Sequence, residues 1–288
     1  MERETRERSS ARPGEEQRRT TRRGKVWERT GFGDKTAWDW LQLLIVPAML
    51  GFGALFFNEA QSTRQLETEE RRARAQLEAE DERAQEERLQ TYLGEIGTLL
   101  IDEDLLGSEE NDEARYLARA RTLAVLRRAD GEQRRSVVEF LAESGLAGSR
   151  VPGTDVEPVI SLANANLSEA DLTLIDYLQG TDLTETDLSD ATVLRINLSK
   201  AVLRRANLTE ADLAGTILRQ TDLNEATLTS TNMQQVDLSG ADLTGANLSA
   251  ADLTDANLED ATGITVEELE EQTASLEGAT MPDGTVHD

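Results

Sequence analysis

The sequence contains no cysteine and a single histidine, His287, among 288 residues. Without thiols the chain can form no disulfide, no thiolate metal site and no cysteine nucleophile. We expect the histidine to lie in a frayed C-terminal tail, where it supports neither a general base nor a histidine metal site. Aromatic residues make up only 4% of the chain. These absences remove most familiar catalytic chemistry, and we expect no enzyme, no cofactor and no bound metal.

Positive charge is scarce and unevenly distributed. The chain carries 56 Asp and Glu against 30 Lys and Arg, a formal net charge of −26. From residue 160 onward there are 24 acids and 5 bases, whereas residues 1–35 hold 11 bases and 7 acids. The interleaved acids argue against an N-terminal nucleic-acid arm. We expect residues 1–37 to be a disordered charged tail, and we expect no direct nucleic-acid binding.

Only one apolar run is long enough to cross a bilayer. No charge interrupts the sequence from Leu41 to Phe57, and Trp38 and Trp40 precede the run like aromatic residues at a membrane interface. A buried core helix and a cleaved signal are the rival interpretations, but the neighbouring sequence is too polar and the run starts late. We expect residues 38–58 to form one transmembrane helix. The arginine-rich tail favours a cytoplasmic N-terminus. Arginines beyond the other end of the run leave the side of the C-terminal domain open.

Residues 59–145 are predicted to form a juxtamembrane helical stalk and a small helical bundle. Strong helix formers with opposite charges three or four residues apart predict a solvated helix over about 59–103. A homodimeric coiled coil is one interpretation of its thin apolar stripe, but the early heptads are polar. Two further helices are expected at about 112–128 and 132–144. Their apolar residues should pack on the Leu93–Leu100 face: Tyr116, Leu117, Leu123, Leu126, Val137, Phe140 and Leu141.

A five-residue phrase recurs about twenty times in residues 160–263, after a Gly/Pro-containing linker at 146–159. A small or β-branched residue is followed by Asp or Asn, then leucine, then two mostly polar residues. The leucines at the centre of the phrase are Leu167, Leu172, Leu183, Leu188, Leu198, Leu203, Leu208, Leu213, Leu218, Leu223, Leu228, Leu238, Leu243, Leu248, Leu253 and Leu258.

The five-residue period excludes both an α-helix and a flat β-strand. Five helical residues turn about 500°, so the leucines of a helix would be spread around every side. In a flat strand, an odd period would send successive leucines to opposite faces. The chain must therefore turn a corner in each repeat, with every leucine pointing toward a shared axis. A short repeat that buries its apolar face only by stacking is typical of a solenoid.

The phrases "ANLSE ADLTL" and "ADLTG ANLSA ADLTD ANLED" resemble the pentapeptide-repeat family, whose pattern is A(D/N)LXX. The resemblance covers about a third of the chain. It implies a right-handed quadrilateral β-helix with four pentapeptides per coil. The "WDWLQLLIVP" and "ARARTLAVLRRADG" phrases are similar to the amino-terminal part of membrane-anchored bacterial members, a subgroup of unassigned activity. Together these features predict a membrane-anchored α plus β-solenoid protein of the bacterial cell membrane.

The repeat is irregular at its beginning and ends in a cap. Ile175, Asp176 and Tyr177 fit the three defined positions, which makes Tyr177 the central residue and Gly180 an extra one. Leu174 and Leu178 would then point outward and dock on the helical bundle. Residues 264–288 are expected to cover the last coil. Thr265 and Glu268 would form a capping box in a short helix, with Ile264, Val266, Leu269 and Leu276 as its apolar face.

Two functions are compatible with this organisation. The first is a non-enzymatic, membrane-tethered scaffold that displays the rod to a protein partner. The acidic rod carries a basic belt that consists of Arg195, Lys200, Arg204, Arg205 and Arg219. This belt is either a solvated patch or a candidate surface for an anionic lipid or partner. The oligomeric state, monomer or homodimer, stays open.

The second function is a DNA-mimicking inhibitor, since some members of the resembled family are acidic rods that bind DNA gyrase. Residues 160–262 hold 17 acids and 5 bases. Duplex DNA as long as five coils carries about 14 phosphate charges, so the charge densities are similar. The rod is short, the belt interrupts its acidic surface, and an anchor would keep it from chromosomal enzymes. We therefore rank the scaffold first.

The inward position of the leucines can be tested at Leu213, in the middle of the repeats. We expect Leu213→Asp to lower the free energy of unfolding by more than about 4 kcal/mol, because a buried carboxylate has no partner there. Leu213→Met should cost less than about 1.5 kcal/mol. Urea unfolding followed by circular dichroism measures both values, and an Asp variant as stable as wild type would contradict the inward assignment.

Overall fold

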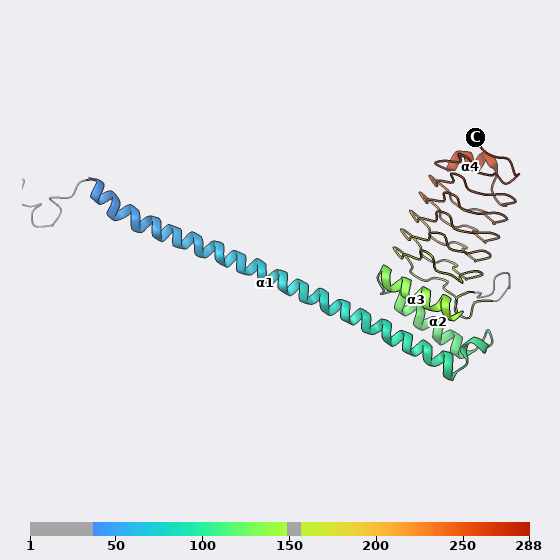
Figure 1. Ribbon diagram of the computed structural model, residues 1–288, viewed down its shortest axis with the longest axis horizontal. Helices are drawn as coiled ribbons and strands as arrows, with labels where there is room; N and C mark the ends of the chain where they lie inside the picture. The colour runs from blue at the N-terminus through green and yellow to red at the C-terminus, as the bar shows by residue number, and fades with distance from the viewer. Residues whose placement is uncertain (1–36, 149–156) are drawn as a thin grey trace, which may run out of the picture. The chain divides into compact units, whose positions relative to one another are not determined.

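The computed structural model describes residues 37–148 and 157–288, so the expected tail and residues 149–156 of the linker lie outside the described residues. In these ranges the helices are α1 (Ala37–Asp102), α2 (Glu113–Leu126), α3 (Gly131–Ser144) and α4 (Val266–Gln272), as Figure 1 shows, and a short 3₁₀ helix η1 (Leu105–Gly107). The chain divides into two compact units, residues 1–77 and 78–288.

The first unit contains the apolar part of α1. Its residues from Leu41 to Asn58 have a mean hydropathy of 1.8, and none of them is buried. An 18-residue helix is about 27 Å long, close to the hydrocarbon thickness of a bilayer. Trp38 is 65% exposed, whereas the side chain of Trp40 lies outside the described part. By length and composition this segment is one candidate membrane-spanning helix.

The second unit begins with the remainder of α1, which packs on α2 and α3. Leu89, Tyr92, Ile96 and Leu99 follow one another at helical spacing and are all buried. The hydroxyl of Tyr92 lies 2.9 Å from that of Thr122, which gives this buried polar group a partner.

The contributions of α2 and α3 to this core are only partly as expected. Leu126, Val137 and Leu141 are fully buried. Tyr116 and Leu117 are 60% and 41% exposed, so the expectation that they join the core is wrong. They lie in the first turns of α2, on the side that faces solvent.

The expected linker begins as part of this core. Gly145 ends α3 at a φ of 77°, and the amide of Leu146 donates to the carbonyl of Leu141 at 2.8 Å. Leu146 and Ala147 are both fully buried. The amide of Ile160 then donates to the carbonyl of Leu146. Residues 146–147 therefore belong to the packed helical region rather than to a solvated linker.

From Ile160 the chain coils into a solenoid (Figure 1). Isolated parallel bridges join residues 20 apart, from Asp182 with Val202 to Asp242 with Thr262, so each coil contains four five-residue repeats. At each corner the amide of one repeat's first residue donates to the preceding leucine carbonyl, as from Ala211 to Leu208 at 3.1 Å. The last residue of each repeat has a positive φ, which closes the turn.

The interior is a column of leucines lined by small residues. All sixteen central leucines are at most 4% exposed. Threonines that replace alanine at the first position of a repeat are also buried, and their hydroxyls donate to backbone carbonyls, as from Thr186 to Leu162 at 2.9 Å. Burial of each leucine contributes about 1.5–3 kcal/mol before chain entropy is subtracted.

The irregular coil differs from the sequence expectation. Leu178 is 2% exposed and takes the central position, whereas Tyr177 is 42% exposed with a φ of 67°. The extra residue therefore lies between Ile175 and Leu178, and Gly180 is an ordinary corner residue with a φ of 70°. Leu174 is 67% exposed, so it does not dock on the helices. The bridge from Asn166 to Asp187 spans 21 residues for the same reason.

Arginines from α2 and α3 close the first end of the solenoid. The first coil has no preceding coil to donate to its carbonyl groups, which would otherwise form an open edge. Arg119 donates to Ala163 at 3.0 Å, and Arg134 to Ser168 at 2.5 Å. Arg135 donates to the carbonyls of Asp171 and Thr173. The helical region is therefore the cap of the solenoid as well as its N-terminal neighbour.

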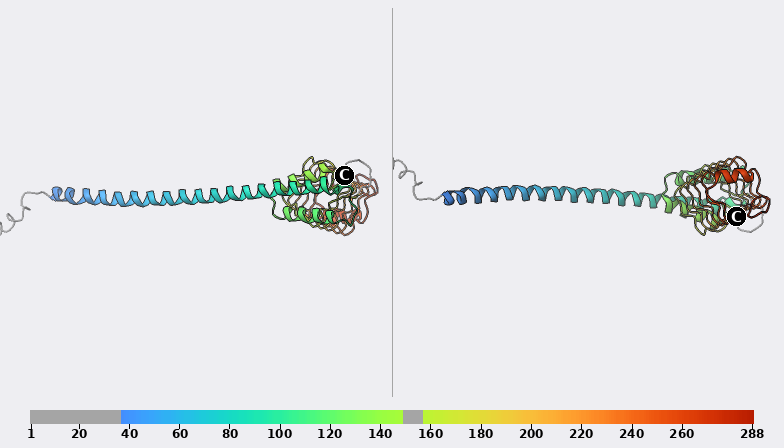
Figure 2. Two further views of the ribbon diagram at one scale, coloured as in Figure 1. Left: turned by 90° about the horizontal axis from the view of Figure 1, so that it is seen from below. Right: turned by 90° about the horizontal axis from the view of Figure 1, so that it is seen from above.

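The helix α4 interrupts the solenoid near its other end, and Figure 2 shows it over the coils in the view from above. The expected capping box of Thr265 and Glu268 is confirmed. The helix follows Gly263, where a Cβ would lie 2.3 Å from the Thr244 hydroxyl, at a φ of 80°. Of the expected apolar face, Leu269 and Leu276 are buried, whereas Ile264 before the helix and Val266 at its first position are partly buried.

The solenoid resumes after α4, although residues 264–288 were expected only to cover the last coil. Ser275 bridges Asp252 and Thr280 bridges Asn257, each 23 residues apart, so three extra residues are accommodated by the helix. Leu276 and Met281 continue the interior column. His287 is not frayed, because its amide donates to the carbonyl of Ala279 at 2.8 Å.

The position of the extra residue can be tested by two alanine substitutions. We expect Leu178→Ala to lower the free energy of unfolding by about 2–5 kcal/mol, since it leaves a cavity in the column. Tyr177→Ala should cost less than about 1 kcal/mol, because the ring is largely outside the core. Urea unfolding measures both, and a larger loss at Tyr177 would restore the register expected from the sequence.

Candidate interaction surface

The outer surface of the solenoid consists of side chains stacked from coil to coil. The residues on either side of each leucine point outward, and those 20 positions apart share one side of the rod. The carboxylate of Asp187 accepts from the amide of Ser189 at 3.1 Å and from its hydroxyl at 2.8 Å. It also accepts from the Asn207 side chain of the next coil at 3.0 Å. These Asp and Asn residues therefore stabilise the turns.

The described carboxylates of the rod support the turns and are not gathered around one point. A calcium site needs six to eight oxygens converging on one point. Within residues 37–148 and 157–288 no group of three His, Cys, Asp or Glu side chains has such an arrangement. The outward columns are thus a surface of regularly spaced polar groups.

The residues of the basic belt lie on three successive corners of the rod. Arg195, Lys200 and Arg205 are five apart and occupy corner positions with φ of 55°, 58° and 54°. Arg204 and Arg219 stand next to such positions. The belt therefore runs around the rod and does not form a patch on one flat side.

Three belt residues form ion pairs along the rod axis. Arg205 lies between Glu185, at 3.5 Å, and Glu225, at 2.6 Å, which occupy the same corner in the coils before and after it. Arg204 pairs with Asp222 at 3.7 Å. Arg219 pairs with Asp237 at 2.5 Å. Exposed pairs of this kind contribute little to stability because solvent screens them, and they leave less positive charge for a partner.

The surroundings of Arg195 differ from those of the three paired arginines. Arg195 forms no ion pair or side-chain hydrogen bond with another residue of the described ranges, and its side chain is stacked below Gly215. Because glycine carries no side chain, the corner above Arg195 is open. The corner of Arg195 is accordingly where the belt presents an accessible charge.

A model of pentapeptide repeats, in eight copies, matches residues 181–220, 206–245 and 221–260. The matched residues are those in which the coils have their regular 20-residue spacing. The chain belongs to the pentapeptide repeat family. Pentapeptide repeats imply a right-handed quadrilateral β-helix, in agreement with the four repeats per coil.

Several solved structures of this family are similar to the chain. HetL, a pentapeptide repeat protein involved in heterocyst differentiation regulation from the cyanobacterium Nostoc sp. strain PCC 7120, is 30% identical, with a TM-score of 0.33. The match covers 44% of this chain, which spans only 60% of the length of HetL. No curated protein matches the sequence.

Two further solved structures match a part of this chain comparable in length to the part that HetL matches. A pentapeptide repeat protein from the thylakoid lumen of Arabidopsis thaliana is 33% identical, with 38% of this chain and 71% of that chain covered and a TM-score of 0.19. QnrB1, a plasmid-mediated fluoroquinolone resistance protein, is 16% identical. Its match covers 43% of this chain and 65% of QnrB1, with a TM-score of 0.19.

Hydrogen bonds lower the pKa of several carboxyl groups on the pentapeptide-repeat surface. The side chain of Arg205 donates to Glu225 and lowers its pKa. At Asp242 the pKa is lowered by the side chain of Thr244, then by that of Asn224 and by the amide of Thr244. Other carboxyl groups with a lowered pKa are Asp171, Asp237, Asp252 and Asp283.

These shifts predict that the pentapeptide-repeat protein loses stability in acid. An Asp whose pKa is lower in the folded state contributes stability above its unfolded value of about 3.9, and that contribution disappears as the pH falls through the folded value. Asp242→Asn keeps an oxygen acceptor but does not titrate, so its stability should decline less between pH 5 and about pH 2. Urea midpoints across this range measure the difference, and parallel profiles would contradict the assignment.

Proposed function

We propose that the protein is a non-enzymatic, membrane-tethered scaffold that presents its repeat rod to a protein partner. Pentapeptide repeat proteins are generally structural or interaction proteins rather than enzymes. The observation that carries the proposal is the rod itself, whose leucine column is buried and whose outer columns are regularly spaced. Such a surface offers repeated contacts to a partner and no enclosed reaction site.

The apolar part of α1 is the proposed anchor. None of its 18 residues from Leu41 to Asn58 is buried, and most of them are apolar, which is costly in water and favourable in a bilayer. Trp38, at the start of the helix, has the amphipathic ring that suits a membrane interface. A single-pass anchor of this kind would hold the rod near a bacterial cell membrane.

The proposed anchor can be tested with the full chain in bacterial membranes. We expect the protein to stay with the membrane fraction after an alkaline carbonate wash, and its intact mass to include residues 38–58. Replacement of Leu44 and Leu50 by arginine should release it, since each arginine at mid-membrane costs about 2.5–3.5 kcal/mol. Release of the wild-type chain, or cleavage after the apolar run, would overturn the anchor.

We propose the corner of Arg195 as the partner-binding part of the belt. The absence of native cysteine allows site-specific crosslinking. Ser199→Cys places a benzophenone maleimide next to Lys200, and Ser249→Cys places the same probe on another side of the rod. We expect one protein to crosslink from position 199 only, with at least a fivefold lower yield when Arg195→Glu is added. Equal yields from both positions, or none, would contradict the proposed surface.

The DNA-mimicking inhibitor remains the second candidate, favoured by the net acidity of the rod. Gyrase supercoiling measured with the purified chain separates the two functions. The scaffold predicts no inhibition at micromolar protein, because Arg205 and its neighbours interrupt the acidic columns. Clear inhibition that disappears when Glu185 and Glu225 are replaced by glutamine would favour DNA mimicry instead.

A further inference from the structure

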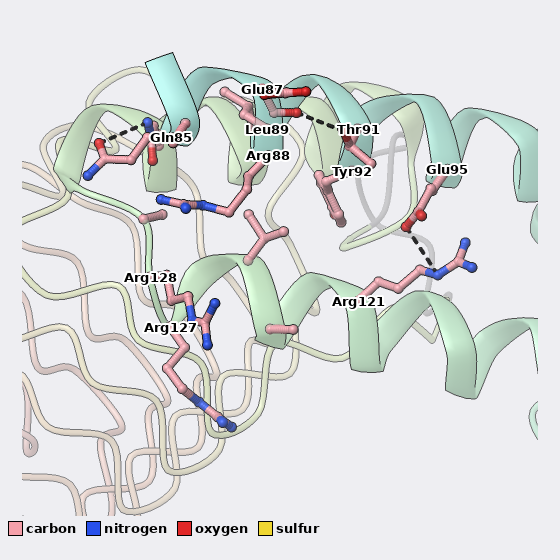
Figure 3. A pocket seen from close by; sticks show the side chains of 15 residues that line it. Gln85, Glu87, Arg88, Leu89, Thr91, Tyr92, Glu95, Arg121, Arg127 and Arg128 are labelled. Carbon is pink, nitrogen blue, oxygen red and sulfur yellow. Dashed lines mark hydrogen bonds and ion pairs between the residues drawn. The ribbon is translucent and has the colours of Figure 1, made fainter. Parts of the chain in front are cut away.

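A pocket of about 740 Å³ lies between α1 and α2 in the second unit (Figure 3). Its floor is apolar and includes Leu89, Tyr92 and Val125. Gln85 of α1 and Gln133 of α3 are joined across one end by a hydrogen bond of 3.3 Å. The volume lies within the range of about 300–1,000 Å³ that is typical of small-molecule sites.

Four arginines line this pocket. Arg88 comes from α1, and Arg121 comes from α2 and pairs with Glu95 at 3.3 Å. Arg127 and Arg128 follow the last residue of α2. In the described part of the chain, Arg88, Arg127 and Arg128 form no ion pair and no side-chain hydrogen bond. Figure 3 shows Arg88 extending from α1 into the space beside α2.

The charge of this pocket is opposite to that of the molecule. The chain has a formal net charge of −26, whereas the pocket is lined by four arginines and two glutamates. Positive side chains near the end of α2 are favoured by the helix dipole, which accounts for Arg127 and Arg128. It does not account for Arg88, which belongs to another helix and reaches the same space.

We propose that this pocket binds a small soluble molecule that carries a phosphate group and an apolar body. A guanidinium group donates two parallel hydrogen bonds to a phosphate, which makes unpaired arginines suitable ligands. The apolar floor would contact the remainder of the molecule and favour it over free phosphate. Binding here is separate from the partner surface at Arg195, which lies on the solenoid.

The test uses the full chain in a neutral detergent and three probes. Isothermal titration calorimetry compares 1-naphthyl phosphate, 1-naphthol and inorganic phosphate. We expect saturable binding of 1-naphthyl phosphate that is at least tenfold tighter than that of either other probe. Equal affinity for inorganic phosphate, or no saturable binding of 1-naphthyl phosphate, would overturn the proposal.

Two double variants with the same charge change locate the site. Arg88→Gln with Arg128→Gln should weaken 1-naphthyl phosphate binding at least tenfold, while circular dichroism and the urea midpoint stay unchanged. Arg71→Gln with Arg74→Gln, in the part of α1 before the pocket, should weaken it less than twofold. Equal weakening in both variants would show a general charge effect and overturn the assignment.

A lipid headgroup carries the same phosphate group, so the last part of the test uses lipid vesicles. Sedimentation with phosphatidylcholine vesicles that contain phosphatidylglycerol is measured for both double variants, each with Leu44 and Leu50 also replaced by arginine so that the proposed anchor does not itself hold the chain on the vesicles. We expect the two variants to bind these vesicles equally. If only the Arg88 and Arg128 variant loses vesicle binding, and the wild-type chain does not bind 1-naphthyl phosphate, the arginines serve a lipid and the proposal is wrong.

Discussion

The structure depends on burial of one column of leucines along the axis of the coils. Because the chain turns a corner every five residues, each leucine reaches the axis and meets the leucine 20 residues later in the next coil. No repeat can bury its leucine alone, so stability arises from stacking neighbours. The polar residues on either side are then directed outward, where they support the turns and form the surface columns.

A stack of coils has two ends, and this chain protects each of them differently. At the first end, Arg119, Arg134 and Arg135 donate to carbonyl groups that no earlier coil can reach. At the other end, α4 is inserted and two further repeats follow it, and the backbone at His287 pairs with the last of them. Open edges would favour association with other chains, so both devices limit aggregation.

The charged groups serve two separate purposes in this arrangement. On the rod, Arg205 pairs with acids in the coils before and after it, so much of the belt supports the stack. In the helical cap, Arg88 and Arg128 line a pocket and have no such partners in the described ranges. A protein that is acidic as a whole therefore keeps a local positive site, which is the environment that an anionic ligand requires.

The sequence alone determined the repeated parts of this protein. The five-residue period predicts the coil and the buried leucines, and the Thr265–Glu268 pair predicts the start of α4, because both depend on residues close together in the chain. Tertiary structure decided where the period breaks. Leu178 rather than Tyr177 enters the core, since a leucine fills the column and the tyrosine is accommodated in a bulge. The arginines of the cap and of the pocket meet only after folding, because they come from helices whose packing no local pattern encodes.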